Sequence, residues 1–193
     1  GASRGHGSRE GRLGLVRPDY SPARALARAA RRGPGRLSLV DAATGERWTV
    51  SQSFDAVARL AGAFRRRGLG AGTRIALIGA NSAWHFLCHA AASWLHAVTV
   101  PLSPRLPSSA LASMCVRVGV TWAFVDESAS LHARALADAG IRTFPWDDLR
   151  SWTRHGDPIA GEPARCGAEL AAILFTSGST GMPRPVELTH EVM

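Results

Sequence analysis

The stretch "LFTSGSTGMPR", residues 174–184, places hydroxyl side chains, glycines and one cation directly after an apolar run. Glycine permits positive φ and close approach of a ligand, and backbone amides and hydroxyls donate hydrogen bonds to oxygen anions. A guanidinium can bind a phosphate through two parallel hydrogen bonds. The stretch therefore predicts a phosphate-binding loop, with a plain flexible connector as the alternative. The candidate ligand-binding residues are Thr176, Ser177, Gly178, Ser179, Thr180, Gly181 and Arg184.

The spacing of the glycines excludes two common nucleotide-binding motifs. A Walker A loop requires GxxxxGK[ST], whereas Gly178 and Gly181 are three residues apart and Met182 follows. The dinucleotide fingerprint GxGxxG does not fit either. A P-loop kinase and a Rossmann dehydrogenase are therefore disfavoured.

The residues that precede this loop predict an α/β fold. Residues 21–33 predict a short amphipathic helix, and residues 36–50 predict a hairpin with its turn at 41–45. Thr49 and Gln52 form a capping box before the next helix, and Asn81 is expected to cap a helix over 83–95. Apolar strands then alternate with helices, which indicates a mostly parallel sheet flanked by helices. The strands are expected at 74–79, 97–102, 121–126 and 141–146, and the later helices at 107–118 and 128–139.

Two segments lack any apolar period and are expected to lie outside the core. Residues 1–20 mix glycine, arginine and serine and are predicted to be a mobile basic leader. Residues 147–167 hold glycines, prolines and mixed charges and are predicted to be a surface linker. An apolar strand at 168–177 follows and delivers the loop, and residues 185–193 begin another extended run.

The formal net charge of +8 is concentrated at the beginning of the chain. Residues 1–36 contain nine arginines against Glu10 and Asp19, a formal charge of +7, which leaves +1 for the remainder. Nucleic-acid binding by the folded part is therefore not expected. Weak, salt-dependent binding by the basic arm stays open as the least supported alternative.

Cysteine usage favours a reducing cytoplasm, and the longest uncharged run favours a soluble α/β protein. Cys88, Cys115 and Cys166 are widely spaced without a CxxC motif, so neither a disulfide framework nor a zinc site is indicated and no metal ligand is predicted. The uncharged run 75–104 is long enough to raise a transmembrane span. Histidines, serines and prolines interrupt it, so buried strands and a helix are expected instead of a transmembrane segment.

The loop and the elements before it resemble a known family. "LFTSGSTGMPR" followed by "VELTH" resembles the phosphate-binding signature of AMP-forming adenylating enzymes, which are acyl-CoA synthetases, peptide-synthetase adenylation domains and luciferases. "LVDAATGERWTV" and "RIALIGANSAWHFLCHAAASWLHAVTVPLSPRL" resemble the opening hairpin and early βα units of that family's large domain. The resemblance covers residues 21–193 and implies the first, incomplete subdomain of that domain. The family usually has lysine where Arg184 stands and glycine where Pro185 stands.

The resemblance implies an ATP-dependent carboxylic acid–CoA ligase, with a role in fatty acid metabolism, that uses ATP, Mg²⁺ and coenzyme A. Its members form an acyl-adenylate and pyrophosphate, and a thiol of CoA or of a carrier protein then displaces AMP. The loop residues would cradle the pyrophosphate, and His190 matches the family's "TH" after the loop. The remaining pockets lie in the missing remainder of the enzyme, so this chain is expected to contain no catalytic residue and to be inactive alone. A peptide-synthetase adenylation domain and a non-catalytic truncated binding module are the alternatives.

Overall fold

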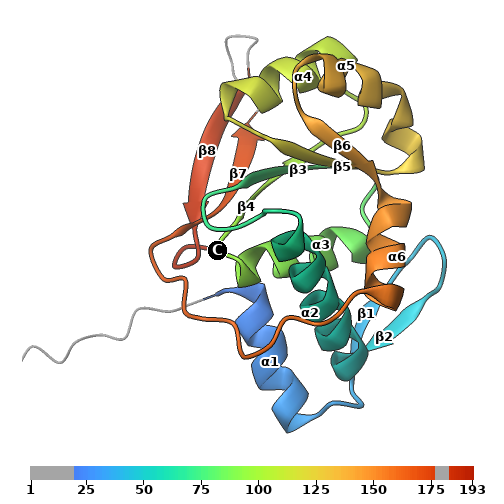
Figure 1. Ribbon diagram of the computed structural model, residues 1–193, viewed down its shortest axis with the longest axis vertical. Helices are drawn as coiled ribbons and strands as arrows, with labels where there is room; N and C mark the ends of the chain where they lie inside the picture. The colour runs from blue at the N-terminus through green and yellow to red at the C-terminus, as the bar shows by residue number, and fades with distance from the viewer. Residues whose placement is uncertain (1–19, 177–182) are drawn as a thin grey trace, which may run out of the picture.

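The computed structural model describes residues 20–176 and 183–193, in which one six-stranded sheet carries helices on both faces (Figure 1). Five strands are parallel, and β8 pairs antiparallel with β7 at one edge. The predicted mostly parallel α/β fold is therefore confirmed. In spatial order the strands are β6 (Arg142–Pro145), β5 (Trp122–Val125), β3 (Arg74–Ile78), β4 (Val98–Leu102), β7 (Leu170–Thr176) and β8 (Arg184–Thr189).

The central strands are buried on both faces, which explains their continuous apolar sequence. In β3, Ile75 and Leu77 belong to one core, and Ala76 and Ile78 belong to the other. Successive side chains of a strand point to opposite faces, so one apolar run serves both cores.

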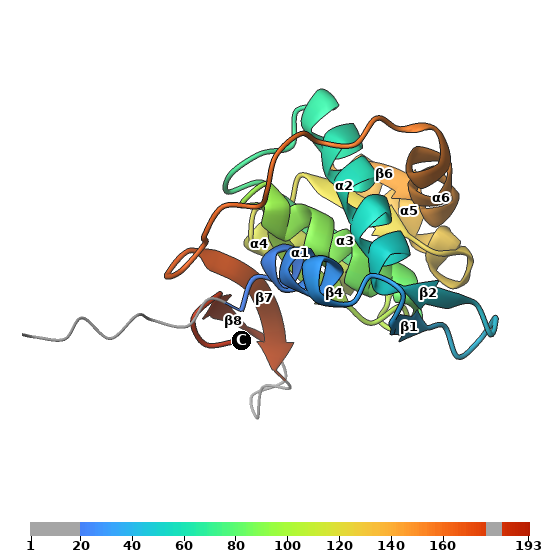
Figure 2. The same ribbon diagram turned by 90° about the horizontal axis from the view of Figure 1, so that it is seen from below.

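The helices divide between these two cores. Figures 1 and 2 show α1, α2, α3 and α6 on one face of the sheet, and Figure 1 shows α4 and α5 on the other. None of the helices within the described residues is long and apolar enough to cross a membrane. Their bounds are α1 (Pro22–Arg32), α2 (Val50–Arg66), α3 (Ala83–Trp94), α4 (Ser108–Arg117), α5 (Ala133–Asp138) and α6 (Trp146–His155).

A separate two-stranded hairpin, β1 (Leu37–Val40) and β2 (Arg47–Thr49), leads into α2. Thr49 Oγ1 accepts a hydrogen bond from Gln52 N at 3.3 Å, and Gln52 Oε1 accepts one from Thr49 N at 2.8 Å. The predicted hairpin and capping box are both confirmed.

The predicted linker over 147–167 is wrong in its first half, because residues 146–155 form α6. Asp147 and Asp148 lie in the first turn of this helix, and Arg154 and His155 lie in the last. These charges complement the helix dipole. Trp146 and Leu149 are buried against the α2–α3 core, and the segment without helix or strand is limited to 156–169.

Two helix predictions also need correction. The N-cap of α3 is Ser82 and not Asn81, and the amide of Ala83 instead donates to Asp41 Oδ2 at 3.1 Å. Asp41 lies in the β1–β2 turn, so the cap comes from a distant segment. The helix expected at 128–139 is split into a 3₁₀ helix, η1 (Glu127–His132), and α5.

Candidate functional site

The β7–β8 hairpin brings together the two predicted loop residues that the structure describes. Thr176 is the register partner of Arg184, and Thr176 Oγ1 donates a hydrogen bond to the Arg184 carbonyl oxygen at 3.4 Å. Both residues are exposed. The other predicted residues lie outside the described part of the chain: Ser177, Gly178, Ser179, Thr180 and Gly181.

The strand after the loop accommodates Pro185 because β8 is the outer strand of the sheet. Proline lacks the backbone N–H and is tolerated at sheet edges. Pro185 keeps register with Phe175, so the antiparallel ladder continues through it.

A second arginine contacts the end of the hairpin. Arg117, in the last turn of α4, donates from Nη1 to the carbonyl oxygen of Pro183 at 3.2 Å. Pro183 immediately precedes Arg184, so two arginines, Arg117 and Arg184, lie at the loop end of the β7–β8 hairpin. Sequence reasoning missed Arg117 because 66 residues separate it from its partner.

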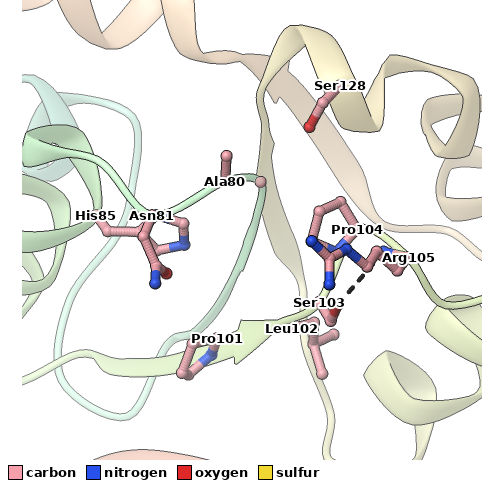
Figure 3. Close-up of a pocket in the computed structure, with 10 residues that line it drawn as sticks. Ala80, Asn81, His85, Pro101, Leu102, Ser103, Pro104, Arg105 and Ser128 are labelled. Carbon is pink, nitrogen blue, oxygen red and sulfur yellow. Dashed lines mark hydrogen bonds between the residues drawn. The ribbon is translucent and has the colours of Figure 1, made fainter. Parts of the chain in front are cut away.

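The carboxyl ends of the neighbouring parallel strands form a pocket of about 700 Å³. Figure 3 shows Asn81 and His85 on one side and Ser103, Pro104 and Arg105 on the other. An adjoining hollow of about 740 Å³ shares Ala80, Asn81 and Ser128 with it. Open parallel sheets bind ligands outside the carboxyl ends of their strands. Because β7 runs parallel to β4, its last residue points toward this same edge.

Asp126, just after β5, fixes the rim of this pocket. Its Oδ2 accepts a hydrogen bond from Ala80 N at 2.6 Å, and its Oδ1 accepts one from Ala129 N at 3.0 Å. A Cβ atom at Gly79 would lie 2.5 Å from Oδ2, so this close approach requires glycine. The carboxylate is therefore engaged in holding two strand ends together.

His85 is the titratable side chain of the pocket whose pKa is shifted. Burial lowers the pKa of His85, and the backbone of Ala80 and the nearby carboxylate of Asp126 partly oppose this shift. Its ring packs edge-on against Trp146 with centroids 4.7 Å apart, and its buried Nδ1 has no hydrogen-bond partner among the described residues. The pocket therefore offers a ligand the half-buried imidazole of His85 together with the guanidinium of Arg105.

Known proteins resemble this chain in sequence and in fold. The probable CoA ligase CCL6 of Humulus lupulus is 26% identical over 220 residues, which cover 96% of this chain and 33% of that protein. Nonribosomal peptide synthetase 8 of Aspergillus fumigatus is 28% identical over 147 residues, which cover 75% of this chain and 2% of that protein. The solved structure of a Mycobacterium tuberculosis fatty acyl CoA synthetase has a TM-score of 0.80 at 22% identity and covers 89% of this chain and 35% of that one.

The fold and these neighbours define an α/β domain of the kind found at the N-terminal side of adenylating enzymes. The family model described as AMP-binding enzyme matches residues 26–193, and the chain belongs to that family. It spans about a third or less of the length of the relatives named above.

Proposed function

We propose that the complete protein is an AMP-forming carboxylic acid–CoA ligase and that this chain supplies the residues that hold the departing pyrophosphate. One observation carries the proposal: the β7–β8 hairpin positions Thr176 and Arg184 side by side on either side of residues 177–182. Membership of the AMP-binding family supports the reaction class.

The proposed reaction has two steps. A carboxylate oxygen of the substrate attacks the α-phosphorus of ATP, the bond from that phosphorus to the bridging oxygen breaks, and pyrophosphate leaves with the electron pair. The thiol sulfur of CoA then attacks the acyl carbon and displaces AMP, while its proton passes to solvent. The hairpin contributes to the first step, because donors fixed beside the leaving phosphates stabilise charge that develops in the transition state.

The described hairpin residues fit phosphate oxygens better than a metal ion. Thr176 offers a hydroxyl and Arg184 a guanidinium, whereas Mg²⁺ prefers carboxylate and water oxygens. Mg²⁺ would enter with the triphosphate and neutralise part of its charge, and we assign it no ligand in this chain. ATP and CoA are proposed as co-substrates on family membership.

Substitution of Arg184 tests the assignment in the complete protein. We expect Arg184→Ala to lower carboxylate-dependent ATP–pyrophosphate exchange by roughly 10²-fold, because one charged donor to the leaving group is removed. Arg184→Lys keeps the charge and should retain most of the activity. Arg134→Ala is the matched control, since Arg134 is exposed and pairs only loosely with Asp138 at 3.9 Å. Equal exchange rates in Arg184→Ala and the control would contradict the proposed role.

Further assays on the same protein identify the thiol that accepts the acyl group and distinguish an enzyme from a non-catalytic binding module. Thioester formation with CoA supports the ligase, and transfer to a carrier-protein phosphopantetheine supports a peptide-synthetase adenylation domain, a choice that the Aspergillus relative keeps open. No exchange with any carboxylic acid, together with pyrophosphate binding that Arg184→Ala abolishes, would instead indicate a binding module. A cytoplasmic location is part of the proposal and rests on the cysteine usage.

A further inference from the structure

Three side chains with metal-binding atoms meet at the start of β7, at the opposite end of that strand from Thr176 and outside the pocket. They are His96, Cys166 and Glu169, and their candidate ligand atoms all lie within 4.8 Å of one another. His96 belongs to the turn between α3 and β4. Cys166 and Glu169 belong to the irregular segment, residues 156–169, which leads into β7. The cluster therefore joins segments about 70 residues apart in the chain.

The turn that carries His96 has an unusual backbone. His96 has φ of 57°, the one positive value among the described non-glycine residues. This left-handed conformation is uncommon for residues with a Cβ, although asparagine, aspartate and histidine adopt it more often than others. Its carbonyl oxygen accepts a hydrogen bond from Gly72 N at 2.9 Å, and its Nδ1 lies 2.5 Å from Glu169 Oε2. The imidazole is thus held against the segment before β7.

Burial decreases across the cluster from the sulfur to the carboxylate. Cys166 is 3% exposed, the His96 side chain is 25% exposed and the Glu169 side chain is 53% exposed. The thiol lies 3.5 Å from the Ser93 carbonyl oxygen, at the end of α3. A cation could therefore approach from solvent at Glu169 and meet the sulfur at the inner end.

We propose that His96, Cys166 and Glu169 bind a single Zn²⁺ ion. Imidazole nitrogen, thiolate sulfur and carboxylate oxygen are the three ligand types that zinc uses in proteins, and soft thiolate disfavours Mg²⁺ and Ca²⁺. Tetrahedral bonds of about 2.0–2.3 Å place ligand atoms about 3.5 Å apart, so the cluster needs local adjustments of about 1 Å. On binding, Cys166 loses its thiol proton to solvent, His96 binds as neutral imidazole, and water completes the fourth position.

The ion would connect the start of β7 to the α3–β4 turn. The first part of the irregular segment is already attached to the helical layer, through the buried side chain of Ile159, the bond from Ile159 N to Ala58 O at 2.9 Å and the exposed pair of Arg66 and Asp157 at 3.9 Å. Metal binding to a folded site stabilises the folded state. We expect the ion to stabilise the folded chain, and its binding can be measured without any assay of the proposed ligase activity.

Co²⁺ and Zn²⁺ binding to the full chain test the site. We expect one Zn²⁺ per chain in competition with a chromophoric chelator, and a thiolate-to-cobalt charge-transfer band on addition of Co²⁺. Cys166→Ser should remove the band, whereas the control Cys115→Ala, which removes another buried thiol, should keep it. Absence of stoichiometric binding, or a charge-transfer band that persists in Cys166→Ser, would overturn the proposal.

Two further substitutions at the proposed ligands are chosen to leave the fold intact, so that a loss of binding is not caused by unfolding. His96→Asn preserves a residue that tolerates positive φ, and Glu169→Gln changes an exposed side chain. Each should weaken Zn²⁺ binding at least about tenfold and abolish the rise in Tm that Zn²⁺ produces in the wild-type chain. His155→Asn, at an exposed histidine, is the control and should respond to Zn²⁺ as the wild type does. Unchanged Zn²⁺ affinity in both variants would show that the histidine and carboxylate only pair with each other.

Discussion

At the scale of single residues, His89 shows how a polar side chain is held neutral inside the fold. Its Nδ1 is 2.6 Å from Thr99 Oγ1, and its buried Nε2 has no hydrogen-bond partner among the described residues. Burial, with a smaller effect of the nearby His190, lowers the pKa of His89 to about 4. Protonation of His89 therefore opposes folding.

The resulting pH dependence can be predicted. Between pH 6.5 and 4 the unfolded chain takes up a proton at His89 that the folded chain excludes, so the free energy of unfolding should fall as the pH falls. The expected slope is about 1.4 kcal/mol per pH unit, to a total of about 3 kcal/mol. Urea denaturation at several pH values measures it.

Matched histidine variants show whether the slope comes from His89. His89→Asn retains a polar group near the position of Nδ1 and should flatten the profile, whereas His155→Asn should leave it unchanged. A wild-type slope in His89→Asn would assign the effect to other groups.

At the scale of elements, features formed by neighbouring residues could be predicted from the sequence, and features formed between distant segments could not. The capping box of α2 is contained within four residues, and the sequence predicts it correctly. The first amide of α3 is bound by Asp41, 42 residues earlier. The backbone amide of Ala83 lowers the pKa of this carboxylate, and burial partly opposes the shift. Helix α6 was missed because its sequence is largely polar, although its acidic first turn and basic last turn were available as signals.

The contact between α2 and the irregular segment depends on a glycine. A Cβ atom at Gly62 would lie 2.3 Å from the Asp157 carbonyl oxygen and 3.2 Å from Ile159 N. Alanine usually stabilises a helix interior by about 1 kcal/mol relative to glycine. Here we expect Gly62→Ala to destabilise the protein by about 1–3 kcal/mol, because the backbone of 157–159 must move away.

Urea denaturation compares Gly62→Ala with Gly70→Ala, where an added Cβ meets no atom within 4 Å. The control should change the free energy of unfolding by no more than about 0.5 kcal/mol. A Gly62→Ala variant more stable than the wild type would show that helix propensity outweighs the contact.

At the scale of the whole molecule, the order of strands and helices was predictable because apolar runs alternate with amphipathic ones. The antiparallel edge strand was expected only as an extended run, since strand direction depends on partners and not on local pattern. Thr176 and Arg184 were proposed as site residues from a continuous motif, and the structure places them side by side, while their role in binding phosphate stays a prediction. Arg117, His85 and the His96–Cys166–Glu169 cluster were not predicted, because each is assembled from segments distant in sequence.

The position of the β7–β8 hairpin sets an order of assembly for the sheet. Strands β3 to β6 pair with one another through several register pairs and are contiguous in the chain, whereas the β4–β7 ladder has one register pair, Thr99 with Ala172. During synthesis the inner strands can therefore pair before β7 emerges. In the native protein the hairpin should open as its own cooperative unit, with amide hydrogen exchange in β7 and β8 faster than in β3. Equal protection of all three strands would contradict this order.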